Sequence, residues 1–298
     1  MILLRQRLGG QPGLARLCAL FGCSRSAFYQ QIQRQFELSI EQELVVGKVL
    51  EIRLEQPRIG TQKLLQVMRP FLESHGIKMG RDALFQLLDQ QNLLIRSHKK
   101  KGPKTTDGTG APLWPNLLEG LQITAIHQVW ATDITYLPLQ NGQWCYLMAI
   151  VDLFSHKIVG FHISADMHTS SCLIALDQAL IGLPLAHQGL IHHSDRGSQY
   201  RSQAYLARLK LYKIQASMCT KPQENGVSER LNGILKNELL DGRSFPDVEQ
   251  ARSQTTNAVH IYNRCRPHES LGGLFPEQVH QGMQPGKSLW KKDEDVNH

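Results

Sequence analysis

The chain has 298 residues, of which 41% are hydrophobic and 20% are charged. This composition is typical of a folded globular protein with room for two or three domains, and it excludes a disordered chain. No apolar run approaches the roughly 18 residues of a membrane span, and the apolar N-terminal stretch is too short for a secretory signal. We therefore expect no membrane partner and a cytoplasmic location.

The net charge of +7 is unevenly distributed along the chain. Residues 1–104 hold 17 Lys and Arg against 8 Asp and Glu, whereas residues 105–298 hold 16 against 18. A basic region attached to a nearly neutral one indicates a nucleic-acid-binding part joined to a domain with another task. An ordinary solvated basic surface is the alternative, and charge alone does not exclude it.

Residues 1–40 are predicted to contain a helix-turn-helix segment that binds DNA. Apolar residues repeat at helical spacing on both sides of Gly22, and Ser24 is suited to cap the second helix. The polar side of that helix offers Arg25 and Tyr29 for contacts with phosphates and base edges. Many helical hairpins have this pattern, so simple packing is the alternative.

Residues 41–96 form a second predicted helical domain, either a small bundle or another helix-turn-helix. Its amphipathic helices are expected at residues 41–56, 61–74 and 81–92. Residues 97–122 are rich in Lys, Gly, Thr and Pro, a composition typical of a flexible linker. This basic linker is expected to lie along a phosphate backbone, with contacts from Lys99, Lys100 and Lys101.

From residue 123 the hydrophobic pattern changes from helical to strand-like. Strands are expected at residues 127–139, 144–154, 157–164, 189–192 and 213–216. Helices are expected at residues 169–181, 198–210, 227–240 and 247–264. Three consecutive strands followed by alternating helices and strands predict a mixed five-stranded α/β sheet with flanking helices over residues 123–285. Residues 286–298 are predicted to be a charged C-terminal tail.

Three carboxylates of this region are candidates for a metal site. Asp133 lies inside the first strand, where a charged side chain needs solvent, a partner or a metal. Asp195 follows the fourth strand, at the kind of strand end where ligands gather, and Glu229 lies near a helix start. Each alone is compatible with an ordinary surface carboxylate, but together they provide the oxygen ligands that Mg²⁺ prefers.

A lysine extends this candidate site. Lys236 follows Glu229 by seven residues on the same predicted helix face, where it could hold a DNA phosphate or base. A solvated helix lysine is the alternative. Two metal ions about 3.5–4 Å apart would activate the attacking oxygen and stabilise the leaving one in phosphodiester chemistry.

Four blocks of the sequence resemble the transposases of the bacterial insertion sequence three family. They occur in the family's order, and they are WATDITYLP, HHSDRGSQYRS, QENGVSERLNGILKNE and YNRCRPHESLG. They resemble the second reading frame of that family, which carries a DDE core like that of retroviral integrases. The segment at residues 56–68 is similar to the helix-turn-helix that precedes this core in the family.

The resemblance implies an RNase H-like catalytic core that performs DNA strand transfer. Asp133 and Asp195 match the two catalytic and metal-binding aspartates, Glu229 matches the glutamate, and Lys236 matches the basic residue after it. Supporting residues are expected in the matching blocks, at His193, Ser194, Arg266 and His268. The interval between Asp195 and Glu229 is slightly shorter than is common in the family, and we expect this to alter the loop before the helix and not the carboxylate.

The resemblance also implies cofactors and partners. Two magnesium ions per site are expected, with manganese as an alternative ion. The expected partners are double-stranded DNA, as element ends and as target, a second or further copy of the chain, and a first-reading-frame product that is separate or fused. Such an enzyme is expected in the bacterial cytoplasm, associated with the nucleoid.

The third carboxylate has competing candidates, because Glu224 and Glu238 also follow Asp195. Glu224 lies in a predicted loop, whose backbone is poorly fixed, and Glu238 lies roughly 13 Å beyond Glu229 along the helix axis. Glu229 is therefore preferred, and Glu238→Gln is expected to retain substantial activity.

The predicted function is that of a DNA transposase, which cuts at element ends and joins the freed 3′-hydroxyl to another phosphodiester. Two alternatives are a nuclease of the same fold that only hydrolyses, and a DNA-binding regulator with an inactive core. The basic helical region and the block YNRCRPHESLG argue against the nuclease. The presence of all three carboxylates argues against the regulator.

Overall fold

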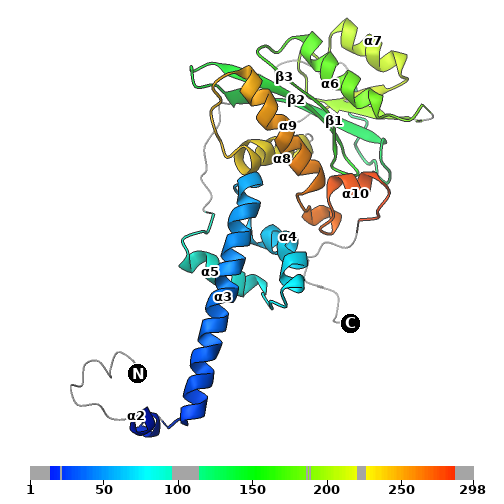
Figure 1. Cartoon of the computed structure of the whole chain (residues 1–298). Coiled ribbons are helices and arrows are strands. Elements are labelled where there is room, and N and C mark those ends of the chain that lie inside the picture. The colour runs from blue at the N-terminus through cyan, green and yellow to red at the C-terminus, as the bar shows by residue number, and fades with distance from the viewer. Residues whose placement is uncertain are drawn as a thin grey trace. The chain divides into compact units, whose positions relative to one another are not determined.

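A computed structural model describes residues 14–20, 22–95, 114–185, 187, 189–219 and 226–285 (Figure 1). The chain divides into two compact units, of which the first comprises residues 1–51 and 68–94 and the second residues 52–67 and 95–298. Most of the predicted basic linker, with Lys99, Lys100 and Lys101, lies outside the described residues, as does the predicted C-terminal tail. Among the described residues, no helix is long and apolar enough to cross a membrane.

The N-terminal region is helical, as expected: the helix predicted at residues 61–74 is confirmed, the one predicted at 81–92 ends two residues earlier, and the helices before residue 56 differ from the predicted ones. The structure has α2 (Leu14–Leu20), α3 (Arg25–Glu55), α4 (Thr61–Ser74) and α5 (Arg81–Gln90). Gly22 makes the expected turn with a positive φ of 65°, and the Ser24 hydroxyl accepts a hydrogen bond from the Ala27 amide, as a helix cap does.

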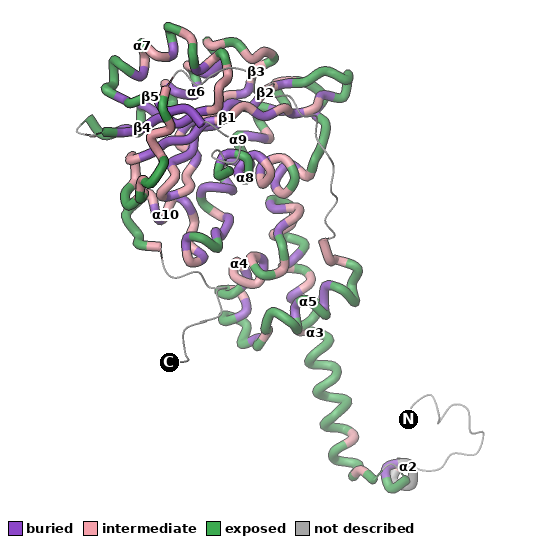
Figure 2. The backbone as a smooth tube through the Cα atoms, turned by 180° about the vertical axis from the view of Figure 1, so that it is seen from behind, coloured by how far each residue is buried: buried purple, intermediate pink, exposed green. Residues whose placement is uncertain are grey.

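The boundary predicted at residue 40 is wrong as an element boundary. The helices expected on either side of it form one helix, α3, of 31 residues. Residues 34–40 contain neither Gly nor Pro, so nothing in the chain ends the helix there. Figure 2 shows much of the N-terminal half of α3 as exposed, whereas Val45 and Val49 in its C-terminal half are buried.

The second unit contains the predicted mixed sheet of five strands. They are β1 (Val129–Pro138), β2 (Trp144–Asp152), β3 (Ile158–Ser164), β4 (Ile191–Ser194) and β5 (Gln215–Met218), in the order β3-β2-β1-β4-β5. The first three strands form an antiparallel meander, and β4 and β5 run parallel to β1. This arrangement confirms the predicted fold class, because β1 brings the meander and the parallel pair into one sheet.

Helices cover both faces of this sheet, as Figure 1 shows. On one face lie α6 (Thr169–Ile181) and α7 (Gln203–Leu211), and on the other lie α8 (Gly226–Ile234) and α9 (Val248–Arg264). Side chains of β2 alternate between the two cores: Leu147 and Val151 pack toward α8 and α9, and Met148 and Ile150 toward α6. The central strands of the sheet are therefore largely buried between two layers of helices.

The helix predicted at residues 227–240 changes type along its length. It is α-helical as far as Ile234 and continues as a π-helical turn, Leu235–Leu239. The amide of Leu240 donates to the carbonyl oxygen of Leu235 at 2.8 Å, five residues back instead of four. The hydrophobic pattern contains no signal for this turn, which is rare and depends on contacts with distant residues.

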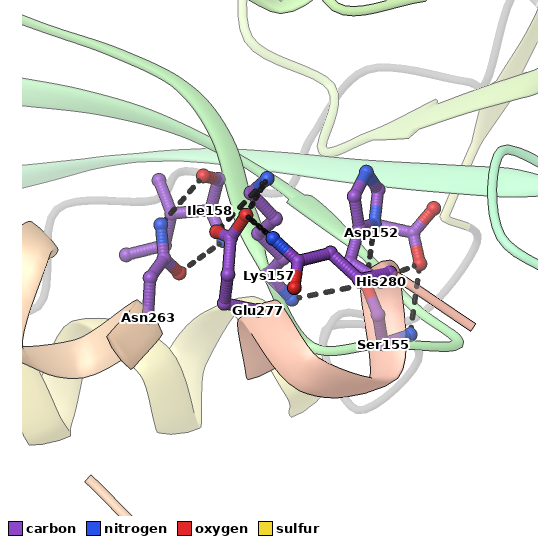
Figure 3. A network of polar contacts seen from close by, with 8 residues as sticks. Asp152, Ser155, Lys157, Ile158, Asn263, Glu277 and His280 are labelled. Carbon is purple, nitrogen blue, oxygen red and sulfur yellow. Dashed lines mark hydrogen bonds and ion pairs between the residues drawn. The ribbon is translucent and has the colours of Figure 1, made fainter. Parts of the chain in front are cut away.

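A buried polar network attaches the C-terminal helices to the turn between β2 and β3 (Figure 3). The Asp152 carboxylate accepts hydrogen bonds from the amide and the hydroxyl of Ser155, and the Ser155 hydroxyl is 3.0 Å from the His280 ring at the end of α10 (Pro276–His280). The Asn263 side chain bonds both backbone groups of Ile158. These contacts satisfy buried polar groups, which is a structural role.

Candidate active site

The sheet places Asp133 and Asp195 on neighbouring strands. In the parallel pair of β1 and β4, Ala131 lies opposite His193. Continuing this register by two residues sets Asp195, just past the end of β4, opposite Asp133. Neighbouring strands lie about 4.8 Å apart, so the two aspartates lie side by side where β4 ends beside the middle of β1.

A tight turn orients Asp195. The amide of Gly197 donates to Asp195 Oδ1 at 2.9 Å, and the Ser194 hydroxyl donates to the Asp195 carbonyl oxygen at 3.0 Å. A Cβ atom at Gly197 would lie only 2.9 Å from Asp195 Oδ1, so a side chain at this position would displace the carboxylate. His193 is fully buried behind the turn, where its Nδ1 is 2.9 Å from the Ser217 hydroxyl of β5. His193 and Ser194 are thus tied by hydrogen bonds to β5 and to the turn at Asp195.

The carboxylate of Asp133 is held from two sides. Its Oδ1 accepts a hydrogen bond from the Ile134 amide at 2.9 Å, and its Oδ2 accepts one from Asn232 Nδ2 at 2.8 Å. Asn232 lies on α8 and is 7% exposed. The sequence analysis missed this residue, although its position three residues after Glu229 places both on one helix face.

Glu229 and Lys236 approach the aspartates from the same helical segment. Glu229 is exposed in the first turn of α8, and Lys236 is partly buried in the π-helical turn. Burial raises the pKa of Asp133 to about 7, with further contributions from the negative charges of Asp195 and Glu229. Burial lowers the pKa of the Lys236 amine, and the negative charge of Asp133 opposes that shift. The four groups therefore interact electrostatically.

Carboxylate oxygens are suitable ligands for a hard divalent cation, although the three carboxylates do not converge on a single position. Asp133 and Asp195 lie side by side with like charges, and burial also raises the pKa of Asp195. A magnesium ion would offset this repulsion, and carboxylate oxygens are its preferred ligands. Within the described ranges, no three His, Cys, Asp or Glu side chains converge closely enough to hold a metal ion. The structure thus brings the two aspartates together and leaves the Glu229 carboxylate exposed on the adjoining helix.

The remaining predicted residues lie elsewhere. Arg25 and Tyr29 are exposed on α3 in the first compact unit. Arg266 and His268 are buried in a separate polar cluster, where Arg266 Nη1 is 3.2 Å from His268 Nε2 and the guanidinium binds Glu238. Their described contacts are with this cluster and not with the three carboxylates.

Comparison with known proteins gives consistent matches over the sheet-containing unit. Two family models, both described as integrase core domain, match residues 124–223 and 212–276. The insertion element IS600 uncharacterized 31 kDa protein of Shigella sonnei is 35% identical over 277 residues, which are 89% of this chain and 99% of that protein. Transposase InsF for insertion sequence IS3A of Escherichia coli is 31% identical over 271 residues, which are 88% of this chain and 92% of that protein.

Among solved structures, the chain matches the HTLV-2 integrase catalytic core domain in complex with magnesium. It is 24% identical, with a TM-score of 0.41, and the alignment covers 57% of this chain and 99% of that one.

Proposed function

Because this chain belongs to the IS3-type insertion-sequence transposases, which carry an integrase core domain, we propose that Asp133, Asp195 and Glu229 form its catalytic centre. The chain is a DNA transposase, an enzyme that breaks and joins phosphodiester bonds. The proposal assigns this chemistry to the place where β4 ends, with one carboxylate each from β1, from the turn after β4 and from α8.

The observation that carries the proposal is the placement of Asp133 and Asp195 side by side on neighbouring strands, where burial and like charge raise the pKa of Asp133 to about 7. Burying a carboxylate beside two others destabilises the fold unless a cation joins them. Groups with pKa values perturbed in this way gather at functional sites. A site for divalent metal explains why the chain retains them.

Magnesium, or manganese in its place, would be held by the carboxylates of Asp133, Asp195 and Glu229 as a pair of ions. When bound, such ions supply Lewis acidity to the attacking and the leaving oxygen of a phosphodiester. Asn232 fixes one oxygen of Asp133 through its 2.8 Å hydrogen bond, which leaves the carboxylate in one orientation. Lys236 supplies a positive charge beside Asp133, suited to a DNA phosphate.

The reaction consists of two displacements at phosphorus. Water first attacks a phosphodiester at an element end and releases a 3′-hydroxyl. The oxygen of that hydroxyl then attacks a target phosphodiester, forms a new bond to phosphorus, and displaces the 3′-oxygen of the target strand. Each displacement forms one phosphorus–oxygen bond and breaks one.

The basic first third of the chain is proposed to bind the element ends. Its 17 basic residues against 8 acidic ones support this role, and Arg25 and Tyr29 are exposed on α3. Lys99, Lys100 and Lys101 are proposed to add phosphate contacts. A homodimer or larger assembly would hold two ends together, with the first-reading-frame product as a further partner.

The test uses the full chain and short duplexes that carry the element's own ends. Asp133→Asn, Asp195→Asn and Glu229→Gln are each expected to reduce magnesium-dependent cleavage and joining by more than about 10³-fold while retaining DNA binding. Asp177→Asn, which removes a surface carboxylate paired with Arg208, is the matched control and is expected to keep wild-type activity. Near-wild-type cleavage by one of the three variants would remove that residue from the centre. Cleavage without joining would support a purely hydrolytic enzyme.

A further inference from the structure

Glu238 occupies a closed cluster of opposite charges. Arg266 donates to both of its carboxylate oxygens, from Nε at 2.7 Å and from Nη2 at 2.8 Å, and Lys63 Nζ lies 3.4 Å from Oε2. Arg266 is 3% exposed. Burial alone would raise the pKa of Glu238, but Arg266 and Lys63 outweigh it and hold that pKa below its usual range. Paired arginine–carboxylate contacts of this kind are among the strongest and most directional in proteins.

This cluster lies in the same π-helical turn as Lys236. The turn is closed by the amide of Leu240, which donates to Leu235, and by the amide of Gly242, which donates to the Lys236 carbonyl oxygen at 2.7 Å. A π-helical turn is less favourable than an α-helical one and persists where surrounding contacts compensate. Leu235 and Leu239 of this turn pack in the hydrophobic core, and Glu238 makes its charged contacts.

The Lys63 side of the cluster belongs to a segment far away in the sequence. Arg58 Nη1 is 3.3 Å from Asp241 Oδ1, and Gln66 Nε2 donates to the Gly273 carbonyl oxygen at 2.6 Å. Ile59 and Leu64 are fully buried between these polar contacts. Residues 52–67 are thereby part of the second compact unit, although the chain on both sides of them belongs to the first.

Stability alone does not account for this arrangement. A buried ion pair loses in desolvation about what it gains in attraction, so apolar residues of equal volume commonly stabilise a fold as well or better. What an arginine–carboxylate pair does provide is a fixed geometry. The geometry fixed here is that of the turn that carries Lys236 and directly continues α8, whose Asn232 donates to Asp133 at 2.8 Å.

We propose that Glu238 is a positioning residue for the DNA-joining reaction: Arg266 and Lys63 fix its carboxylate, and this fixes the π-helical turn that presents Lys236 to Asp133. The inference rests on the proposed function of Asp133, Asp195 and Glu229. It assigns to Lys63, in a segment remote from the core in the sequence, a role in arranging the catalytic centre.

The test compares Glu238→Gln with Glu277→Gln in the full chain. Glu277, on α10, forms an ion pair with Lys157. The Glu277 side chain is 18% exposed and the Glu238 side chain 16%, so Glu277 is a matched control. Amide hydrogen exchange at Leu240 and Gly242 is measured in metal-free protein. We expect Glu238→Gln to accelerate this exchange about tenfold or more and Glu277→Gln to leave it unchanged.

A double-mutant cycle then separates positioning from stability. Glu238→Gln is expected to reduce the rate of joining at saturating DNA about tenfold. If Glu238 acts through Lys236, the variant with both Glu238→Gln and Lys236→Ala loses no more activity than Lys236→Ala alone. Lys63→Met should reduce the rate of joining less than Glu238→Gln does. Lys63→Arg, which keeps the positive charge, should retain the wild-type rate. The Lys63 variants also replace Glu238→Gln if that protein does not fold.

Three results would overturn the proposal: unchanged exchange at Leu240 and Gly242 in Glu238→Gln, additive losses in the double variant, or the same effects from Glu277→Gln. Failure of the proposed function has a different signature. In that case the wild-type protein shows no magnesium-dependent cleavage that Asp133→Asn abolishes. The exchange measurement still decides whether the Glu238 cluster holds the turn.

Discussion

The helical segment formed by α8 and the π-helical turn borders two opposite electrostatic environments. Glu229 lies near Asp133 and Asp195, and Glu238 lies beside Arg266 and Lys63. Around Asp133, carboxylates of like charge lie together, and the pKa of Asp133 is raised to about 7. Around Glu238, an arginine and a lysine surround one carboxylate, and its pKa is lowered. In the first cluster burial and like charges raise the pKa, whereas in the second the carboxylate is neutralised by Arg266 and Lys63.

This difference distinguishes carboxylates that can bind a metal ion from one that holds the backbone in place. A carboxylate that the fold already neutralises has no capacity left for a metal ion, so Glu238 can act only through the backbone that it holds. Carboxylates that are buried beside other negative charges are stabilised most by a bound cation. Acidic residues close together in sequence, such as Glu229 and Glu238, can therefore have unrelated tasks.

The largest expected difference is between the joining activities of Glu229→Gln and Glu238→Gln. The sequence alone predicted that Glu238→Gln retains substantial activity, and the structure lowers that expectation to about a tenth of wild type, against a loss of more than about 10³-fold for Glu229→Gln. Single-turnover joining of labelled duplexes measures both. Equal losses in the two variants would mean that the division between binding and support is wrong.

The pH dependence of stability should have opposite signs at the two sites. The pKa of Asp133 is about 7 in the folded protein against an ordinary value of 3.8, so the folded state binds this proton more tightly than the unfolded state. Stability from Asp133 is therefore present below about pH 4 and lost as pH rises toward 7, by on the order of 2–4 kcal/mol. For Glu238, whose pKa is lowered from 4.5, the contribution is present above that value and lost below it.

Urea unfolding with a chelator at pH 5 and pH 8 measures this contribution. The loss of stability between the two pH values should be smaller for Asp133→Asn than for the wild-type protein. Parallel pH curves for the two proteins would contradict the raised pKa of Asp133.

Magnesium should stabilise the protein through the aspartate pair. At a magnesium concentration ten times the Kd, mass action adds about 1.4 kcal/mol to the free energy of unfolding. The urea midpoint should rise with magnesium in the wild-type protein and not in Asp133→Asn, at ionic strength matched with potassium chloride. An equal rise in both proteins would show that the ion binds elsewhere.

Lys236→Ala should have the smallest effect on stability and a clear one on joining. We expect the free energy of unfolding to change by within about 0.5 kcal/mol, because this side chain reaches partly into solvent. Joining should decrease at temperatures where the variant is fully folded. Activity that merely follows the folded fraction would identify Lys236 as a structural residue.

The sheet and the aspartates could be predicted from the sequence because their signals are local. The apolar run before Asp195 and the alternation around Asp133 each identify a strand and the place of its carboxylate. Adjacent placement of the two strands then follows from the common rules of mixed sheets.

The support around Glu238 had no local signal. Lys63 and Glu238 are 175 residues apart, and nothing in either neighbourhood indicates a partner. Asn232 is a polar residue in a helix with no distinguishing pattern, and its role follows only from its hydrogen bond to Asp133. The continuity of α3 was missed for a different reason, because no residue between the two expected helices favours either outcome strongly.

The parallel pairing of β1 with β4 has a consequence for protein synthesis. Ala131 and His193, which face each other in that pair, are 62 residues apart, and the helix that carries Glu229 follows β4 and β5 in the chain. Contacts so distant in sequence form late, because a long loop must close first. During translation, the segments that carry Asp133, Asp195 and Glu229 can come together only after most of the core has left the ribosome. We therefore expect an incomplete nascent chain to be unable to cut DNA, so that the reactive centre arises together with the folded core that confines it.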